Sequence, residues 1–200
     1  FSARASTSTT AIPLSDKCFA NRDELVLAVD RYLTTEDCPN DSNCEVGKEF
    51  GWPMNSWCVT NIRNMSGLFK DRSVFDEDLH SWNVSSVTDM SWMFYDAAAF
   101  NGDLSSWNVS SVTDMSWMFY YADAFNGDLS SWDVSSVTDM TEMFYYADAF
   151  NQDLCAWADI FSYSSAVDVF TNSGYAFDGT PQLDQRGPFC ASSSCTIRRG

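Results

Sequence analysis

The chain has 200 residues, a formal net charge of −17 at pH 7 and a hydrophobic content of 45%. This apolar content excludes a disordered chain, and no run of about 18 apolar residues is present to form a membrane-spanning helix. This acidity argues against a basic surface that could bind nucleic acid or anionic lipid. We therefore expect a folded domain with no nucleic-acid partner and no membrane insertion.

The first segments in chain order are a lead-in and an N-terminal cap. Residues 1–17 are rich in Ser and Thr and predict a flexible lead-in. Residues 18–56 predict an N-terminal cap with one helix, because Asn21 and an acidic turn precede apolar residues at helical spacing from Leu25 to Leu33. We expect the apolar face of this helix to cover the first repeat.

Residues 57–157 carry a repeat in which a tryptophan returns about every 25 residues, a period typical of solenoids. Methionine, phenylalanine and leucine positions keep the same period, and such a period indicates coils stacked on one another. The predicted fold is an α/β repeat solenoid, leucine-rich-repeat-like, of about four to five such coils between two disulfide-stabilised caps. The tryptophans of the series are Trp57, Trp82, Trp107, Trp132 and Trp157.

Each coil is expected to combine a short helix and a short strand. Apolar residues from Met90 to Phe100 are three and four apart, which fits a short helix or 3₁₀ segment capped by Thr88 or Asp89. Small polar and large apolar residues alternate over 104–109, which predicts a strand that stacks in parallel with its equivalents. A second extended piece would include Val112 and Thr113.

The repeat decays after Leu154. Phe170 follows Trp157 by 13 residues (170 − 157), whereas Phe94 follows Trp82 by 12 (94 − 82), so that the period is no longer kept. Glycines and prolines then interrupt the period, so that residues 158–200 are interpreted as a C-terminal cap and tail.

Seven cysteines lie outside the three most regular coils and favour an oxidising, extracellular compartment. The first four allow three pairings, between which the sequence does not choose. The last three leave one thiol that is free, paired across the two groups or linked to another chain. The disulfide candidates are Cys18, Cys38, Cys44, Cys58, Cys155, Cys190 and Cys195.

Four N-glycosylation sequons agree with secretion. In the third regular coil, Asp133 stands where Asn83 and Asn108 stand in the others. This exchange indicates a side-chain contact to the backbone of a turn, for which either residue serves. The sequons begin at Asn40, Asn64, Asn83 and Asn108.

The motif W-N/D-V-S-S-V-T-D-M-S-x-M-F, which begins at Trp82, resembles the repeat of the BspA-type leucine-rich-repeat-like surface proteins. The resemblance covers residues from about 55 to 157, and residues 151–157 with 187–190 resemble the terminal cap of that family. Tyr175 stands where such caps commonly have a cysteine. The resemblance implies extracellular display, with adhesion or ligand binding, and no enzyme activity.

Two series of aspartates recur with the repeat. Stacked carboxylates repel one another, so that each needs a hydrogen-bond donor or a cation. We favour capping of backbone amides and, for the second series, hydrogen bonds along the stack from Asn101, Asn126 and Asn151; calcium is the weaker alternative, since no known calcium-loop motif is present. The series are Asp89, Asp114 and Asp139, and Asp103, Asp128 and Asp153.

Aromatic residues adjacent in sequence predict an exposed aromatic patch, because neighbours cannot all point inward. Glu142 replaces the tryptophan of the two preceding coils. The alternative is that some of the rings only pack against neighbouring coils. The patch comprises Trp92, Trp117, Tyr120, Tyr121, Tyr145 and Tyr146.

No catalytic constellation is recognisable. His80 is the only histidine, so that histidine triads and histidine-rich zinc sites are excluded within this chain. We expect no enzyme, no metal and no cofactor. The sequence predicts a secreted or cell-surface glycoprotein module for adhesion that binds an extracellular protein or glycan. The alternative is a structural subunit whose copies assemble into an extracellular filament or coat.

Overall fold

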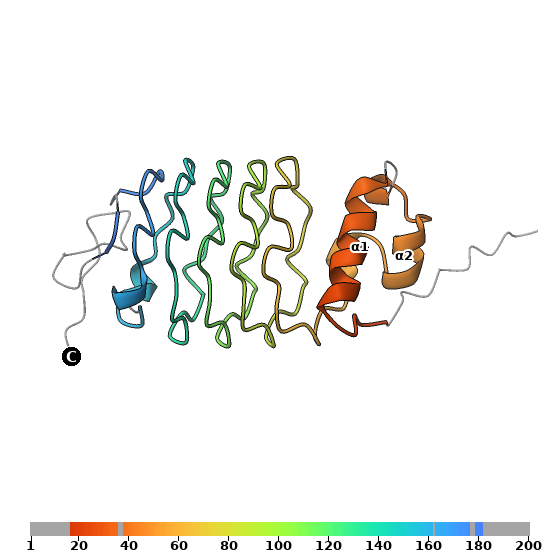
Figure 1. The fold of residues 1–200 in the computed structure, drawn as a ribbon, viewed down its shortest axis with the longest axis horizontal. Coiled ribbons are helices and arrows are strands. Elements are labelled where there is room, and N and C mark those ends of the chain that lie inside the picture. The colour runs from red at the N-terminus through yellow and green to blue at the C-terminus, as the bar shows by residue number, and fades with distance from the viewer. Residues whose placement is uncertain (1–16, 36–37, 162, 177–178, 182–200) are drawn as a thin grey trace, which may run out of the picture.

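The computed structural model describes residues 17–35, 38–161, 163–176 and 179–181. Irregular coils lie side by side in one stack, and two α-helices lie at its N-terminal end (Figure 1). The lead-in, apart from Lys17, and residues 182–200 with Cys190 and Cys195 lie outside the described residues. The helices are α1 (Arg22–Thr34) and α2 (Glu45–Phe50), with 3₁₀ helices at Cys38–Asn40, Met54–Ser56, Cys155–Trp157 and Tyr163–Ser165.

Helix α1 confirms the helix expected near the N-terminus. The Asn21 side chain accepts a hydrogen bond from the amide of Glu24, at 3.0 Å, and so caps the first turn. Tyr32 of α1 is fully buried, and its ring meets the ring of Trp57 edge-on at 5.4 Å. The helix therefore covers the first coil, as its apolar spacing predicts. The short helix α2 was not expected.

The local structure predicted inside the coils is wrong. Within the described residues no strand forms, neither over 104–109 nor near Val112, and the segment from Met90 to Phe100 is a series of turns rather than a helix. Alternate amides make different bonds: Met90 N donates to Asp114 O of the next coil at 2.9 Å, whereas Met93 N closes a turn onto Met90 O at 3.2 Å. Parallel pairing is reduced to isolated bridges such as Asp89 with Asp114.

These turns require a left-handed backbone at two places in each coil. In the second coil Trp92 has φ 61° and Asp96 has φ 55°, each at the third position of a four-residue turn. That conformation defines a type II turn and breaks both helical and extended geometry. The spacing of apolar residues reports which side chains are buried, and it does not show this reversal of the backbone.

The hydrogen-bond register shows that one residue is inserted after the fourth coil, where the sequence indicated only that the period is lost. The amide of Met90 in the second coil pairs with the carbonyl of Asp114 in the third. The equivalent Met140 pairs with Ser165, which lies one position farther along the chain than this offset predicts. The pattern thus continues through residues 165–171, and the positive-φ residues Asp168 and Asn172 follow Glu142 and Tyr146.

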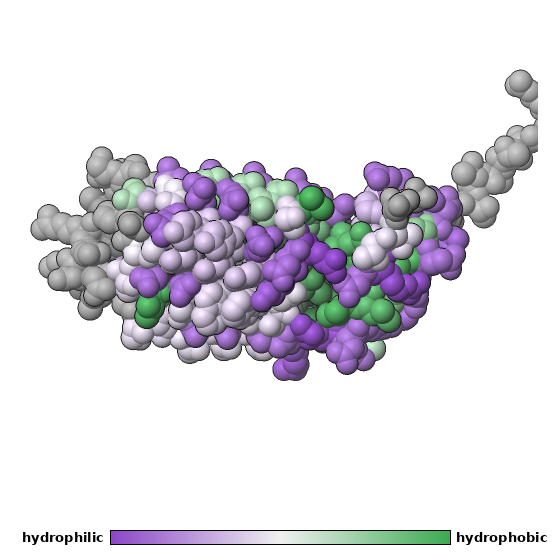
Figure 2. All heavy atoms as spheres, turned by 45° about the horizontal axis from the view of Figure 1, so that its top comes forward, coloured by the Kyte–Doolittle hydropathy of each residue, from purple (hydrophilic) through white to green (hydrophobic). Residues whose placement is uncertain are grey.

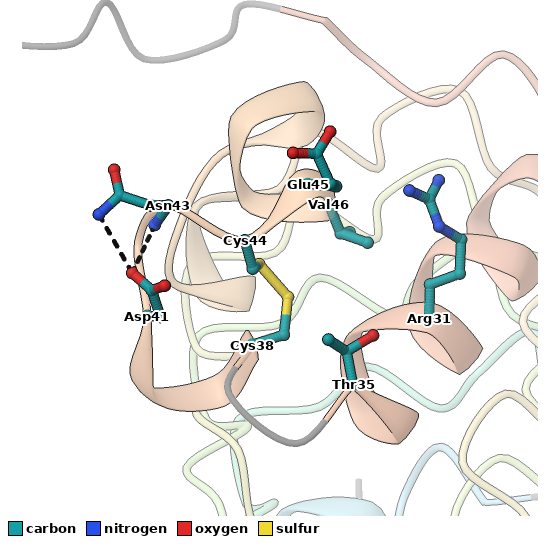
Figure 3. Close-up of a pocket in the computed structure, with 8 residues that line it drawn as sticks. All are labelled: Arg31, Thr35, Cys38, Asp41, Asn43, Cys44, Glu45 and Val46. Carbon is teal, nitrogen blue, oxygen red and sulfur yellow. Dashed lines mark hydrogen bonds between the residues drawn. A yellow bond between two sulfur atoms is a disulfide. The ribbon is translucent and has the colours of Figure 1, made fainter.

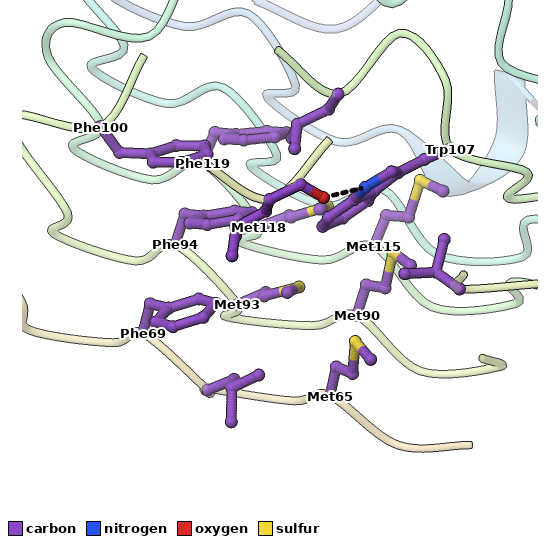
Figure 4. Packing of buried hydrophobic residues seen from close by; sticks show 14 of the residues in the cluster. Met65, Phe69, Met90, Met93, Phe94, Phe100, Trp107, Met115, Met118 and Phe119 are labelled. Carbon is purple, nitrogen blue, oxygen red and sulfur yellow. Dashed lines mark hydrogen bonds between the residues drawn. The ribbon is translucent and has the colours of Figure 1, made fainter. Parts of the chain in front are cut away.

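The core consists of side-chain columns that run along the stack. Met65, Met90 and Met115 form one row, and the rings of Phe69, Phe94 and Phe119 form another, with centroids 5.4–5.5 Å apart (Figure 4). All five repeat tryptophans, from Trp57 to Trp157, are at most 3% exposed. The repeat therefore builds a continuous apolar interior.

Two disulfides join described cysteines, and both lie in the N-terminal part of the chain. Cys18 pairs with Cys58, which ties the segment before α1 to the first coil, and Cys38 pairs with Cys44 between α1 and α2. This is one of the three pairings that the sequence left open. Cys155 is disulfide-bonded as well.

Candidate functional site

The surface that we call the aromatic face consists of three rows of rings that run from coil to coil. It contains the six predicted residues and one that the sequence reasoning missed, Tyr95. Only Tyr121, at 39%, is exposed; the other rings are half-buried by their neighbours, so that the predicted exposed patch is only partly exposed. The residues of the aromatic face are Trp92, Tyr95, Trp117, Tyr120, Tyr121, Tyr145 and Tyr146.

The rings stack from coil to coil. Trp92 lies 4.7 Å from Trp117 between ring centroids, with 29° between the planes. Tyr120 stacks on both Tyr95 and Tyr145, at 4.7 and 5.1 Å, with planes within 7° of parallel. These contacts cover ring faces along the stack.

Contacts between the rows join the rings into one network. Trp92 contacts Tyr95 at 4.9 Å, and the pairs Tyr120–Tyr121 and Tyr145–Tyr146 meet edge-on at 4.8 Å. The structure therefore brings together all the aromatic residues that the sequence singled out. Pale side chains of near-neutral hydropathy cover much of the visible side of the stack (Figure 2).

Lys70 closes the N-terminal end of the aromatic face. Its ammonium lies 4.1 Å from the ring centroid of Trp92 and 4.5 Å from that of Tyr95. Both distances suit a cation–π interaction. The sequence reasoning missed Lys70, although it precedes Tyr95 by one repeat, and that equivalence could have identified it.

The aromatic face is built on the left-handed positions of the coils. Trp92 (φ 61°) and Trp117 (φ 54°) occupy the position that Gly67 (φ 63°) occupies in the first coil. Tyr121 and Tyr146, at φ 54° and 55°, occupy the second such position. A bulky residue in this conformation is a genuine outlier, at a cost of roughly 1–2 kcal/mol.

Acidic residues accompany the rings. Burial first, and then the neighbouring Tyr146 and the carboxylate of Glu142, raise the pKa of Tyr145 above its ordinary value. Burial also raises the pKa of Tyr95, with smaller contributions from Asp71 and Asp96. The phenol groups therefore stay protonated well above neutral pH and remain hydrogen-bond donors.

The aspartate series make the capping contacts that we favoured. Asp89 accepts a hydrogen bond from the amide of Ser91 at 3.0 Å, and Asp103 accepts one from Ser105 at 2.9 Å. The equivalents Asp114, Asp139, Asp128 and Asp153 accept from the amide two residues on. Among the described residues, no group of three His, Cys, Asp or Glu side chains is arranged to hold a metal ion.

Asparagines hydrogen-bond along the stack as the sequence predicted. The amide of Asn126 donates to the side chain of Asn101 at 2.8 Å, and the amide of Asn151 donates to that of Asn126 at 2.9 Å. The turn contact expected from the Asn/Asp exchange is present, since Asn83 and Asp133 each accept from the amide two residues on. These positions are therefore structural whether or not a glycan is attached.

The sequons differ in accessibility. Asn40, Asn83 and Asn108 are exposed. Asn64 is half-buried, and its side chain donates to Asp89 at 2.7 Å and accepts from Arg22 at 3.1 Å. A glycan on Asn64 would disrupt these contacts.

His80 is exposed and lies in a turn. Its Nδ1 lies 2.9 Å from the carboxylate of Asp78, and its Nε2 lies 2.9 Å from Ser81 Oγ. This arrangement agrees with a tolerated surface residue in place of the serines of the other coils.

A separate cavity of about 340 Å³ lies beside the Cys38–Cys44 disulfide (Figure 3). Arg31 of α1 and Thr35, the C-cap of that helix, border it, and Asn43 donates to Asp41 at 2.8 Å on its rim. Two of its lining residues, Thr35 and Cys38, flank residues 36 and 37 in the sequence, which lie outside the described part of the chain.

The helices in the described part of the chain are all too short or too polar to span a membrane.

Comparison with known proteins identifies the family. No curated protein and no solved structure shows significant similarity to the chain. The family described as "Mycoplasma protein of unknown function, DUF285" matches residues 42–157, more than half of the chain. The chain therefore belongs to this DUF285 family.

Proposed function

We propose that the protein is a non-enzymatic extracellular or cell-surface module with a leucine-rich-repeat-like solenoid, which binds a protein partner through its aromatic face. The BspA-like repeat motif supports this description of the fold. The paired cysteines support an oxidising compartment, because disulfides persist outside the cytosol.

One observation carries the proposed binding surface. Gly67 demonstrates that glycine fits the first left-handed position of a coil, yet the next two coils place Trp92 and Trp117 there. Strained residues of this kind persist where a function or the surrounding structure requires them. Both tryptophans are half-buried on the surface and lie outside the apolar interior, so that a requirement for binding is the simplest reason for keeping them.

The stacking geometry favours a protein partner over a glycan. A sugar packs its apolar face on the open face of an aromatic ring. On the aromatic face the ring faces are largely covered, since Trp92 is flanked by Lys70 and Trp117, and Tyr120 by Tyr95 and Tyr145. The rings also carry indole N–H and phenol O–H groups, which suit the mixed polar and apolar surface of a protein.

A filament of stacked copies is the alternative. The N-terminal end of the stack is covered by α1, and Arg22 of that helix donates to Asn64 and to the carbonyl of Ser66 in the first coil. These contacts occupy groups that a preceding coil would otherwise pair, which counts against end-to-end growth. These contacts at the end of the stack do not obstruct side-by-side association of copies through the aromatic face.

The experiment compares the wild type with a Trp92→Gly/Trp117→Gly variant, which keeps the backbone conformation of Gly67. Binding to secreted and surface proteins of the source cells and to a glycan array is measured for both. We expect binding that protease treatment of the target abolishes and that the variant weakens at least tenfold, as for loss of two hot-spot residues. Asp133→Asn is the control, because the equivalent positions carry asparagine.

Other outcomes would contradict the proposal. Binding that survives protease treatment and maps to a glycan would replace the protein partner with a sugar. Binding indifferent to the double variant would remove the aromatic face. Regular fibres of purified protein, seen by electron microscopy, would favour the structural alternative, whereas a monodisperse monomer would eliminate it.

A further inference from the structure

We infer that the aromatic face accepts a lysine or arginine side chain of an extended partner segment, seated on Trp117 beside Glu142. This inference rests on the proposed function and specifies the chemistry of the partner. It follows from an asymmetry between the two ends of the tryptophan column.

At the N-terminal end, the column already holds a cation of the chain itself. Lys70 lies over Trp92 at 4.1 Å, and Trp92 in turn stacks on Trp117 at 4.7 Å. The protein therefore contains an internal example of the contact. A cation on the outer face of this column is a stable arrangement.

At the opposite end, the corresponding ring face has no aromatic neighbour. One face of Trp117 is covered by Trp92, and the other is directed along the stack toward the next coil. There Glu142 occupies the tryptophan position with the same left-handed backbone, at φ 52°. Among the described residues no ring contacts this second face of Trp117, and no basic side chain forms an ion pair with Glu142.

The charges at this end attract a cation. Asp168 follows Glu142 in the column at φ 52° and is exposed. Both carboxylates lie close enough to Tyr145 to contribute to the rise in its pKa. A ring face beside a carboxylate combines the two interactions that hold an ammonium or guanidinium group.

A polypeptide is the occupant that fits these features. The net charge of −17 repels nucleic acid and anionic lipid, and the carboxylates of Glu142 and Asp168 beside the second face of Trp117 favour a cation over a neutral sugar. Lysine and arginine bring an apolar stem that can pack on the rings while the charge lies at Glu142. The partner segment is therefore basic and extended.

The test uses short fluorescein-labelled peptides of glycine and serine that carry several lysines, several glutamines or several glutamates. Binding is measured by fluorescence anisotropy at about 0.15 M salt, because salt at this concentration screens long-range electrostatic attraction. We expect the lysine peptide alone to bind. Glu142→Gln should weaken that binding roughly fivefold to tenfold, as for loss of a charge partner beside a cation–π contact. Asp133→Asn, which changes the net charge equally, should leave the affinity within about twofold.

A second pair of variants tests whether a newly uncovered ring face strengthens the binding of the lysine peptide. Lys70→Gln frees the outer face of Trp92 and should strengthen binding of the lysine peptide. Arg63→Gln removes an exposed positive charge elsewhere on the first coil and controls for net charge. Circular dichroism of each variant checks that the fold is retained.

The results separate this inference from the proposed function. Three results would overturn the cation site. The first is that Glu142→Gln and Asp133→Asn change the affinity for the lysine peptide equally. The others are that the neutral peptide binds as well as the lysine peptide, or that the lysine peptide does not bind. In all three cases, partner binding that still depends on Trp92 and Trp117 would leave the aromatic face in place. Loss of that dependence would overturn both.

Discussion

The indole N–H of Trp107 donates to the backbone carbonyl of Leu79 in the preceding coil at 3.0 Å. The same bond recurs along the stack from Trp82 to Met54, from Trp132 to Leu104 and from Trp157 to Leu129. Each tryptophan thus fills the interior and joins two coils through a buried polar contact. This explains why the repeat keeps tryptophan rather than another large apolar residue.

Trp107→Phe should destabilise the fold by about 2–4 kcal/mol, because it leaves a cavity and a buried carbonyl without its donor. Trp117→Phe is the same chemical change on the surface and should cost less than about 1 kcal/mol. Urea unfolding followed by circular dichroism measures both. Equal losses for the two variants would show that the buried bond contributes nothing.

Glu142→Gly should be more stable than Glu142→Ala by about 1 kcal/mol, because φ at this position is 52° and alanine is strained there. At the nearby exposed Ser136, which has no positive φ, the order of glycine and alanine should be reversed. Thermal melts of the four variants provide the comparison. If the glycine and alanine variants had the same order of stability at both positions, strain in the turn at Glu142 would be excluded.

Tyr32 predicts a loss of stability at alkaline pH. Burial, with a smaller contribution from Glu77, raises its pKa to about 12, whereas the unfolded chain has a pKa of about 10. The folded state therefore holds the proton longer, and its advantage, complete below pH 10, is lost as pH rises toward 12.

Tyr32→Phe removes this pH dependence. Relative to neutral pH, the variant should gain about 1 kcal/mol over the wild type at pH 11. The buried Tyr32 hydroxyl makes no hydrogen bond of good geometry among the described residues, and the nearby Met54 backbone lowers its pKa less than burial raises it. The change should therefore cost little at pH 7. Urea unfolding at both pH values tests the prediction, and parallel curves for the two proteins would contradict it.

The two disulfides should contribute unequally. Cys18 and Cys58 are separated by 40 residues, and Cys38 and Cys44 by 6. In the chain-entropy account, replacing the first pair by serine costs about 4 kcal/mol and replacing the second costs about 2 kcal/mol. Urea unfolding of the two double variants checks the order, and a larger loss from the shorter loop would contradict it.

The sequence by itself determined which side chains are buried and how they repeat. The period of Trp57 and its equivalents places them in one interior column, and Asn21 with its acidic turn marks the start of α1. The exchange of Asn83 for Asp133 revealed a side-chain cap. These features depend on local hydrogen bonds or on burial, both of which composition and spacing record.

Only the tertiary structure decided the conformation of the coils and the make-up of the aromatic face. Met90 finds its hydrogen-bond partner at Asp114, in another coil, and the turns between such bonds reverse the backbone at Trp92. A helix or strand deduced from side-chain spacing cannot anticipate bonds made to a neighbouring coil, because that spacing records only local burial. The position of Lys70 over Trp92 and the pairing of Cys18 with Cys58 likewise depend on how the coils and the cap pack in space.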